Sequence, residues 1–149
     1  MNLEKILLNN QTEIINEAFY SLERSRLKHY DSSRADENWQ RLAKLFDLTL
    51  NGVKSKSLVD MVTYSEKIAK ERYESGFDLH EVHTAYNVLE ESIWKAIIKE
   101  VDSTELAESL GLISTVLGTG KESLAIAFVS LSGKQRVKSL NLSQLFRGK

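Results

Sequence analysis

The chain has 149 residues, no proline and no cysteine, and 28% of its residues are charged while 42% are hydrophobic. The length matches one domain with a sizeable core, and the absence of cysteine excludes disulfides, thiolate zinc sites and cysteine nucleophiles. The formal net charge is −1, but it is unevenly distributed: the five basic residues after Glu122 sum to +5, so residues 1–133 carry −6. Such an acidic body argues against nucleic acid as the main partner.

The N-terminal segment has neither the charged start, the long apolar run nor the cleavage site of a signal peptide, so we expect a cytoplasmic protein. Over residues 3–28, apolar residues recur at helical spacing and predict a long amphipathic helix. The pattern Ser33-x-x-Asp36 predicts a capping box that opens a second helix. Asn51-Gly52 predicts the end of that helix, because glycine adopts the left-handed conformation without steric cost.

The third and fourth predicted helices meet at Gly76. A second capping box, Ser57-x-x-Asp60, opens the third helix, and Gly76 ends it. Directly afterwards Asp78 is placed to cap the fourth helix, and Glu81 is placed to reach back to the cap. The two apolar residues that flank this start, and form a predicted hydrophobic staple, are Phe77 and Val82.

A fifth helix is predicted to begin at Asp102 and Glu105, which repeat the pattern of a cap and its partner. Its apolar stripe alternates steps of four and three over almost four heptads, which is typical of a central or dimerising helix. The alternative is a break at Gly118-Thr119-Gly120, because glycines often interrupt helices. The stripe consists of Leu106, Leu110, Ile113, Leu117, Gly120, Leu124, Ala127 and Leu131.

These elements predict an all-α fold: a five- or six-helix bundle, with globin-like packing as one arrangement and with a long C-terminal helix. Residues 1–133 form the predicted helical domain, and residues 134–149 form a basic C-terminal tail or the start of a connector helix. Lys121 and Glu122 divide the least polar region into pieces shorter than a membrane span, so we expect a core helix there. The basic tail leaves an acidic protein surface or an anionic membrane open as its partner.

The sequence contains no recognisable catalytic centre. His80 and His83 are weak candidates for a metal site, but two ligands at this spacing do not make a zinc site, and we expect no metal. The segment Gly118-Thr119-Gly120-Lys121 departs from the phosphate-loop pattern at two positions. A single imidazole from His29, His80 or His83 suffices to hold haem iron, which leaves a haem sensor as an alternative. We expect neither an enzyme nor a cofactor.

A resemblance to a known family rests on the segment Arg72-x-x-x-Gly76-Phe77-Asp78-Leu79-His80-Glu81-Val82-x-x-x-Tyr86, which continues to Ile93-Trp94. This segment resembles the N-terminal domain of RsbR-type (RsbRD) co-antagonist proteins of bacterial stressosomes and related signal-input domains. The similarity is strongest over residues 35–98 and extends across residues 3–131. The candidate interaction residues that carry it are Arg72, Gly76, Phe77, Asp78, Glu81, Tyr86 and Trp94.

The resemblance implies a helical, often dimeric signal-input domain, globin-like in some members but without bound haem, that biases an attached or partner output domain. It offers no catalytic residue to transfer. We therefore expect residues 1–133 to be a non-enzymatic regulatory domain that acts by protein–protein interaction and homodimerises through its first or fifth helix. A small-molecule or haem sensor with a pocket between helices is the alternative. A nucleic-acid partner and a membrane span are not expected.

Overall fold

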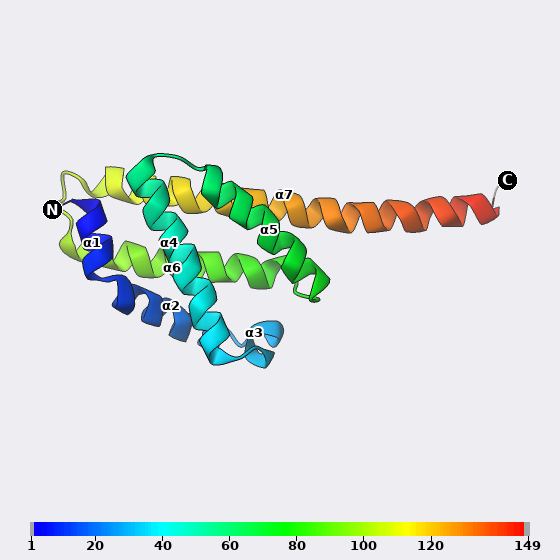
Figure 1. Cartoon of the computed structure of the whole chain (residues 1–149), viewed down its shortest axis with the longest axis horizontal. Coiled ribbons are helices and arrows are strands. Elements are labelled where there is room, and N and C mark those ends of the chain that lie inside the picture. The colour runs from blue at the N-terminus through cyan, green and yellow to red at the C-terminus, as the bar shows by residue number, and fades with distance from the viewer. Residues whose placement is uncertain (1, 148–149) are drawn as a thin grey trace.

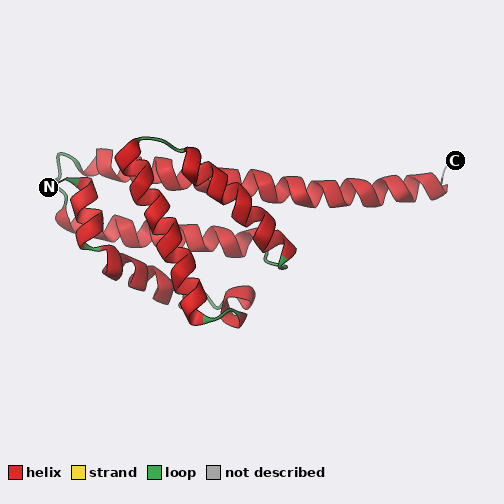
Figure 2. Ribbon diagram, viewed as in Figure 1, coloured by secondary structure: helices red, strands yellow, loops and turns green. Residues whose placement is uncertain are grey.

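The computed structural model describes residues 2–147, with side chains described through Lys134. The described residues contain seven helices joined by short loops, and no strand (Figure 2). The all-α prediction and the prediction of a long C-terminal helix are therefore confirmed. The helices are α1 (Leu3–Asn9), α2 (Gln11–Arg24), α3 (Lys28–Ser32), α4 (Ala35–Ser55), α5 (Val59–Glu74), α6 (Leu79–Glu100) and α7 (Leu106–Arg147).

Helix α7 is the axis on which the bundle is assembled. It runs antiparallel to α6, and α5 crosses it, while α2 packs against the other side of α6 (Figure 1). Helix α4 crosses the bundle and contacts α2, α5, α6 and α7. The N-terminus and the start of α7 lie at the same end, and α7 continues well beyond the opposite end of the bundle (Figure 1).

The core is one continuous cluster of buried apolar side chains contributed by α1, α2 and α4 to α7, with Tyr30 from α3. Each large aliphatic or aromatic side chain that is buried in this way stabilises the fold by about 1.5–3 kcal/mol. The largest fully buried side chains are those of Tyr86, Phe46, Ile6, Leu7, Ile14, Ile15, Leu42, Met61, Leu89, Ile93, Ile97 and Ile113.

Two features give seven helices where five or six were predicted: the first predicted helix is divided, and the short helix α3 follows it. The first predicted helix breaks at Asn10, where α1 ends and α2 begins. The side-chain amide of Asn10 donates to the carbonyl oxygen of Ile6 at 2.8 Å and to Glu100 at 2.7 Å. An asparagine side chain that bonds the backbone in this way competes with continuous helix, so the break has a local cause. The separate turn α3 then follows after residue 27.

The predicted end of a helix at Asn51-Gly52 is wrong. Helix α4 continues to Ser55 and ends at Lys56, which adopts the left-handed conformation with φ 60°. Gly52 instead lies buried against α7, where a Cβ atom would stand only 2.8 Å from Cγ1 of Val116. This glycine therefore permits close packing of two helices rather than ending one of them.

Two of the predicted capping boxes do not form. The residues at the N-caps of α4 and α5 are Arg34 and Leu58, and neither makes a side-chain cap hydrogen bond. The hydroxyl of Ser33 donates instead to the carbonyl oxygen of His29 at 2.8 Å, within the turn that ends α3. Helix α7 likewise begins at Leu106 rather than directly after Asp102.

Helix α7 is continuous through Gly118 and Gly120, so the alternative of two helices is wrong. It also continues without interruption past Lys134, and a domain boundary at residue 134 stays a prediction. The segment Leu106–Lys134 is long and apolar enough to cross a membrane by length and composition, and an 18-residue window within it has a mean hydropathy of 1.3. The core helix of a soluble protein passes the same test, and α7 contributes Ile113, Leu117 and Leu124 to the core.

Gly120 is a point of close approach between α7 and both α5 and α6. A Cβ atom at this position would lie 2.8 Å from Sδ of Met61 on α5 and 2.9 Å from Cε2 of Tyr86 on α6. Real Cβ atoms do not come so near to other heavy atoms. The absence of a side chain at residue 120 therefore sets the spacing between α7 and the α5–α6 pair.

We predict opposite effects of the same substitution at two glycines of α7. Gly120→Ala should lower the free energy of unfolding by about 1–3 kcal/mol, because the added methyl overpacks the contact with Met61 and Tyr86. In Gly118→Ala the added methyl meets no atom within 4 Å. This substitution should raise the free energy of unfolding by about 0.5–1 kcal/mol, since alanine favours helix. Denaturant unfolding measures both, and equal effects would contradict this account of the helix contact.

Candidate functional site

The turn between α5 and α6 has a local explanation in the spacing of Arg72, Gly76 and Phe77. The amide of Phe77 donates to the carbonyl oxygen of Arg72 at 2.9 Å, and that of Gly76 donates to the carbonyl of Tyr73 at 3.1 Å. These two bonds form a Schellman motif, in which the residue after the C-cap takes the left-handed conformation. Gly76 has φ +87°, which glycine adopts without strain. The predicted helix end at Gly76 is therefore confirmed.

The capping box at the start of α6 is also confirmed. The side chain of Asp78 caps the backbone of the first turn, and the amide of Asp78 donates to Oε1 of Glu81 at 3.0 Å. Together with the Schellman motif, this box fixes the path of residues 72–81. The side chains of Phe77 and Glu81 are thereby directed into the bundle, where both are buried.

Glu81 joins α6 to α3. Its carboxylate accepts a hydrogen bond from the amide of His29 at 2.9 Å and contacts Nδ1 of the same residue at 2.7 Å. Burial raises the pKa of Glu81, but the hydrogen bonds from Asp78 and from the backbone and ring of His29 outweigh burial and hold that pKa below its ordinary value. The side chain of Glu81 is 5% exposed, so solvent screens its contact with His29 little.

Phe77 is the centre of a cluster of rings and cations. Its ring lies 5.0 Å from the ring of His29 and 5.1 Å from that of Tyr30, measured between centroids. The guanidinium carbons of Arg41 and Arg72 lie 5.7 and 5.8 Å from the same ring centroid. A cation at this distance from an aromatic face is attracted by its quadrupole. The ring of Phe77 thus contacts two arginines that come from separate helices, α4 and α5.

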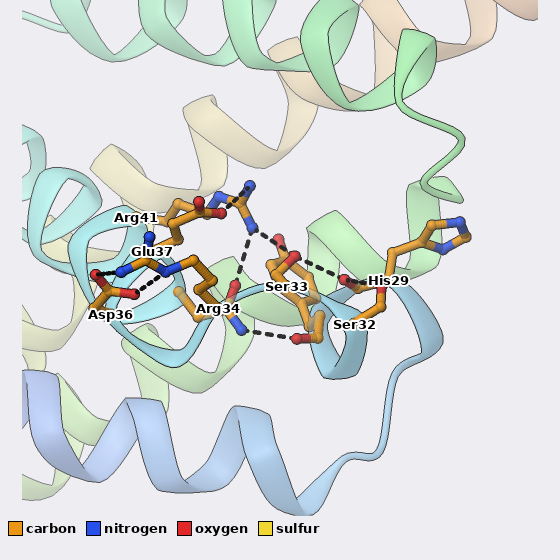
Figure 3. Close-up of polar contacts among 9 residues, drawn as sticks. His29, Ser32, Ser33, Arg34, Asp36, Glu37 and Arg41 are labelled. Carbon is orange, nitrogen blue, oxygen red and sulfur yellow. Dashed lines mark hydrogen bonds and ion pairs between the residues drawn. The ribbon is translucent and has the colours of Figure 1, made fainter.

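Arg41 extends from α4 toward the turn that follows α3 (Figure 3). Its Nη1 donates to Oδ1 of Asn38 at 2.9 Å and to Oγ of Ser33 at 3.2 Å, and its Nη2 lies 3.8 Å from Glu37. The imidazole of His29 points away from this network (Figure 3). Burial and then the positive charge of Arg72 lower the pKa of Arg41.

Arg72 is less completely paired than Arg41. Its Nε is buried and has no hydrogen-bond partner. Burial raises the pKa of Tyr30, and the positive charges of Arg72 and Arg41 offset part of this rise. The two arginines line a small, partly open cavity of about 20 Å³. The other lining residues are Leu22, Tyr30, Asn38, Leu42, Leu45, Tyr64, Ile68, Val82, Ala85 and Tyr86.

Tyr86 connects this cavity to α7. Its hydroxyl is hydrogen-bonded to the hydroxyl of Ser65 on α5, with 2.8 Å between the two oxygens. Burial raises the pKa of Tyr86. The edge of its ring faces Gly120 on α7. The ring of Tyr86 therefore lies between the cavity and α7.

The remaining candidates lie apart from this cluster. Trp94 is 37% exposed on α6 and lies outside the buried core. His80 is exposed and His83 is half-buried, and the described residues contain no group of three side chains that would hold a metal. Burial, then Lys121 and His80, lower the pKa of His83. Lys121 lies within α7 and pairs with Glu90 at 2.8 Å.

Sequence reasoning did not single out Arg41, Tyr30 or Tyr64, although all three line the cavity. They belong to three different helices, so no spacing along the chain brings them together. One signal was available: Asn38 and Arg41 lie on the same side of α4 as the buried residues Leu42 and Leu45. Polar residues on a buried helix face usually have a partner or a ligand there.

A family model described as the RsbT co-antagonist protein rsbRD N-terminal domain matches residues 17–128. The matched region includes α3 to α6 complete and the part of α7 that packs in the bundle. It contains Tyr30, Arg41, Arg72 and Glu81. Comparison with curated proteins and with solved structures finds no match.

We predict that Glu81→Gln lowers the free energy of unfolding by about 1–3 kcal/mol at neutral pH, because a buried charge-assisted contact with His29 is lost. A carboxyl group whose pKa is lowered in the folded state stabilises the fold above its unfolded pKa, and this stability is lost as the pH falls through the folded pKa. The difference between the two proteins should therefore shrink below about pH 4.

Denaturant unfolding at a series of pH values measures this difference. Glu91→Gln, at an exposed position on the same helix, is the control and should leave stability unchanged within about 0.5 kcal/mol at every pH. A constant difference between wild type and Glu81→Gln from neutral to acid pH would show that the charge of Glu81 is not what matters.

Proposed function

The chain belongs to the family of RsbT co-antagonist RsbRD N-terminal domains, and we propose that it is a non-catalytic signal-input domain whose output is a protein–protein contact made by α7. The resemblance drawn from the motif around Gly76 is confirmed. The family is one of stressosome-type signalling input domains, which are regulatory rather than catalytic. The family match is the observation that carries the proposal.

The exposed face of α7 supports the choice of this helix. Ile126 and Val129 are 63% and 62% exposed, while Leu124 and Phe128 on the same two turns are buried. The helix thus has apolar side chains on a face that the bundle does not cover. Exposed apolar surface on a helix that also packs in the core is typical of a protein interface.

The length of α7 points in the same direction. The helix continues for 13 residues after Lys134, which corresponds to about 20 Å along its axis. Isolated helices of this length are marginal in water, and a partner helix stabilises them. Apolar residues recur along this part of the sequence, at Val137, Leu140, Leu142 and Leu145.

The partner proposed for this face is a second copy of the chain. The segment from Lys134 onward carries +5 and the rest of the chain carries −6, so the basic end of one copy complements the acidic body of another. The resemblance implies domains that are often dimeric. An input that displaces Tyr86 would shift α7 at Gly120 and thereby alter the contact between the two copies.

We predict that the protein is a dimer in the high micromolar range and that Ile126→Lys combined with Val129→Lys makes it monomeric, because two charges are then placed in an apolar contact. Val59→Lys is the matched control: this residue is 67% exposed at the start of α5 and should leave the dimer intact. Sedimentation equilibrium measures all three proteins.

Mixing the full-length chain with a form that ends at residue 134 should also give a mixed dimer. A wild-type protein that stays monomeric throughout the same range overturns the proposed contact. Association with anionic vesicles in place of self-association would assign the apolar face of α7 to a membrane.

A further inference from the structure

The cavity between α3, α4, α5 and α6, here called the arginine cavity, is lined by Arg41 and Arg72 together with three tyrosines, Tyr30, Tyr64 and Tyr86. No acidic residue is among its lining side chains. Two partly buried cations therefore border a cavity whose lining contains no fixed negative charge. Buried charges in proteins are usually paired with an opposite charge or with a ligand.

The nearby carboxylates are engaged elsewhere. Glu81 accepts its hydrogen bonds from His29 and from the amide of Asp78. Glu37 lies 3.8 Å from Nη2 of Arg41, and its side chain is 51% exposed, so solvent screens this pair. Neither carboxylate lines the cavity. No residue that lines the cavity therefore offers a carboxylate to the charge of Arg72.

Arg72 also has an unused donor. Its Nε carries one hydrogen that is buried and has no acceptor, although nearly all buried donors in proteins have one. The tyrosine hydroxyls that line the cavity can also donate to a negative group. The missing component is an acceptor, and a negatively charged one would offset the repulsion between the two guanidinium groups as well.

We propose that the arginine cavity is a binding site for a small monovalent anion, with Arg72 and Arg41 as its principal ligands. The volume of about 20 Å³ sets the size: it exceeds the space that one water molecule needs and excludes nucleotides and sugar phosphates. Chloride, nitrate and formate carry the required charge, and chloride is the smallest of the three. The site is separate from the contact proposed for α7, and neither depends on the other.

Occupancy of this site has a route to the rest of the fold. Tyr86 lines the cavity, is held by Ser65 and faces Gly120 of α7. Arg41 at the same time holds the turn after α3 through Ser33. An anion that draws the two arginines together therefore acts on α3, α4, α5 and α6 at once. The bound anion becomes a candidate for the input that this domain senses.

The test compares sodium chloride, nitrate and formate with sodium gluconate at constant ionic strength, because gluconate is too large for the cavity. Thermal unfolding of the full chain should show a saturable stabilisation by the small anions. At ten times its dissociation constant, an anion raises the folding equilibrium constant about elevenfold. Addition of the protein should broaden the chloride NMR signal beyond its width in buffer alone. Nitrate should reverse this broadening, because it competes for the same site.

Two variants localise the effect. Arg72→Gln should abolish both the anion-specific stabilisation and the excess linewidth, because it removes the charge and the unpaired Nε. Arg34→Gln is the control: Arg34 is exposed, pairs with Asp36 on the surface and lies outside the cavity lining, so both signals should remain. If Arg72→Gln does not fold, Arg41→Gln provides the second substitution at the cavity.

The proposal is overturned if the small anions act no differently from gluconate on the wild-type protein, which is the result expected of a cavity that holds only water. It is also overturned if Arg72→Gln and Arg34→Gln retain equal chloride broadening, since the anion then binds elsewhere. Dimer formation by α7 does not enter either readout, so failure of this site and failure of the α7 contact are distinguishable.

Discussion

The close approach of α7 to α5 and α6 at Gly120 is the constraint on which the rest of the structure depends. A side chain of any size here would collide with Met61 and Tyr86, both of which are fully buried. The same principle acts at Gly52, where α4 meets Val116 of α7. Close-packed interiors do not deform continuously, so these contacts hold α7 in one position along the bundle.

The α5–α6 turn is the second fixed point. Its Schellman motif and capping box are complete within residues 72–81, so this turn requires little support from elsewhere. The tertiary contacts built on it are different in kind. Glu81 crosses to α3, and Phe77 gathers Arg41 and Arg72 around one ring. A locally determined turn thus positions a cluster of partly buried charge, which is costly unless partners or a ligand compensate it.

Both proposals follow from groups that the isolated bundle leaves incompletely satisfied. Helix α7 retains exposed apolar side chains at Ile126 and Val129, and Arg72 retains a buried donor without an acceptor. Natural proteins depart from full satisfaction chiefly at functional sites. Tyr86 lies between the two features, in contact distance of α7 and within the lining of the arginine cavity. A signal-input domain requires this kind of connection between a receiving site and an output surface.

The sequence by itself determined the features whose causes lie within a few residues: the all-α class, the end of α5 at Gly76 and the capping box of Glu81. It also identified the family, because this motif is local. Only the tertiary structure decided that Gly52 and Gly120 lie inside helices. Whether a glycine ends a helix or admits a neighbouring one depends on atoms far away in the chain. The meeting of Arg41 with Arg72 was equally beyond the sequence, since packing of separate helices, not spacing, brings them together.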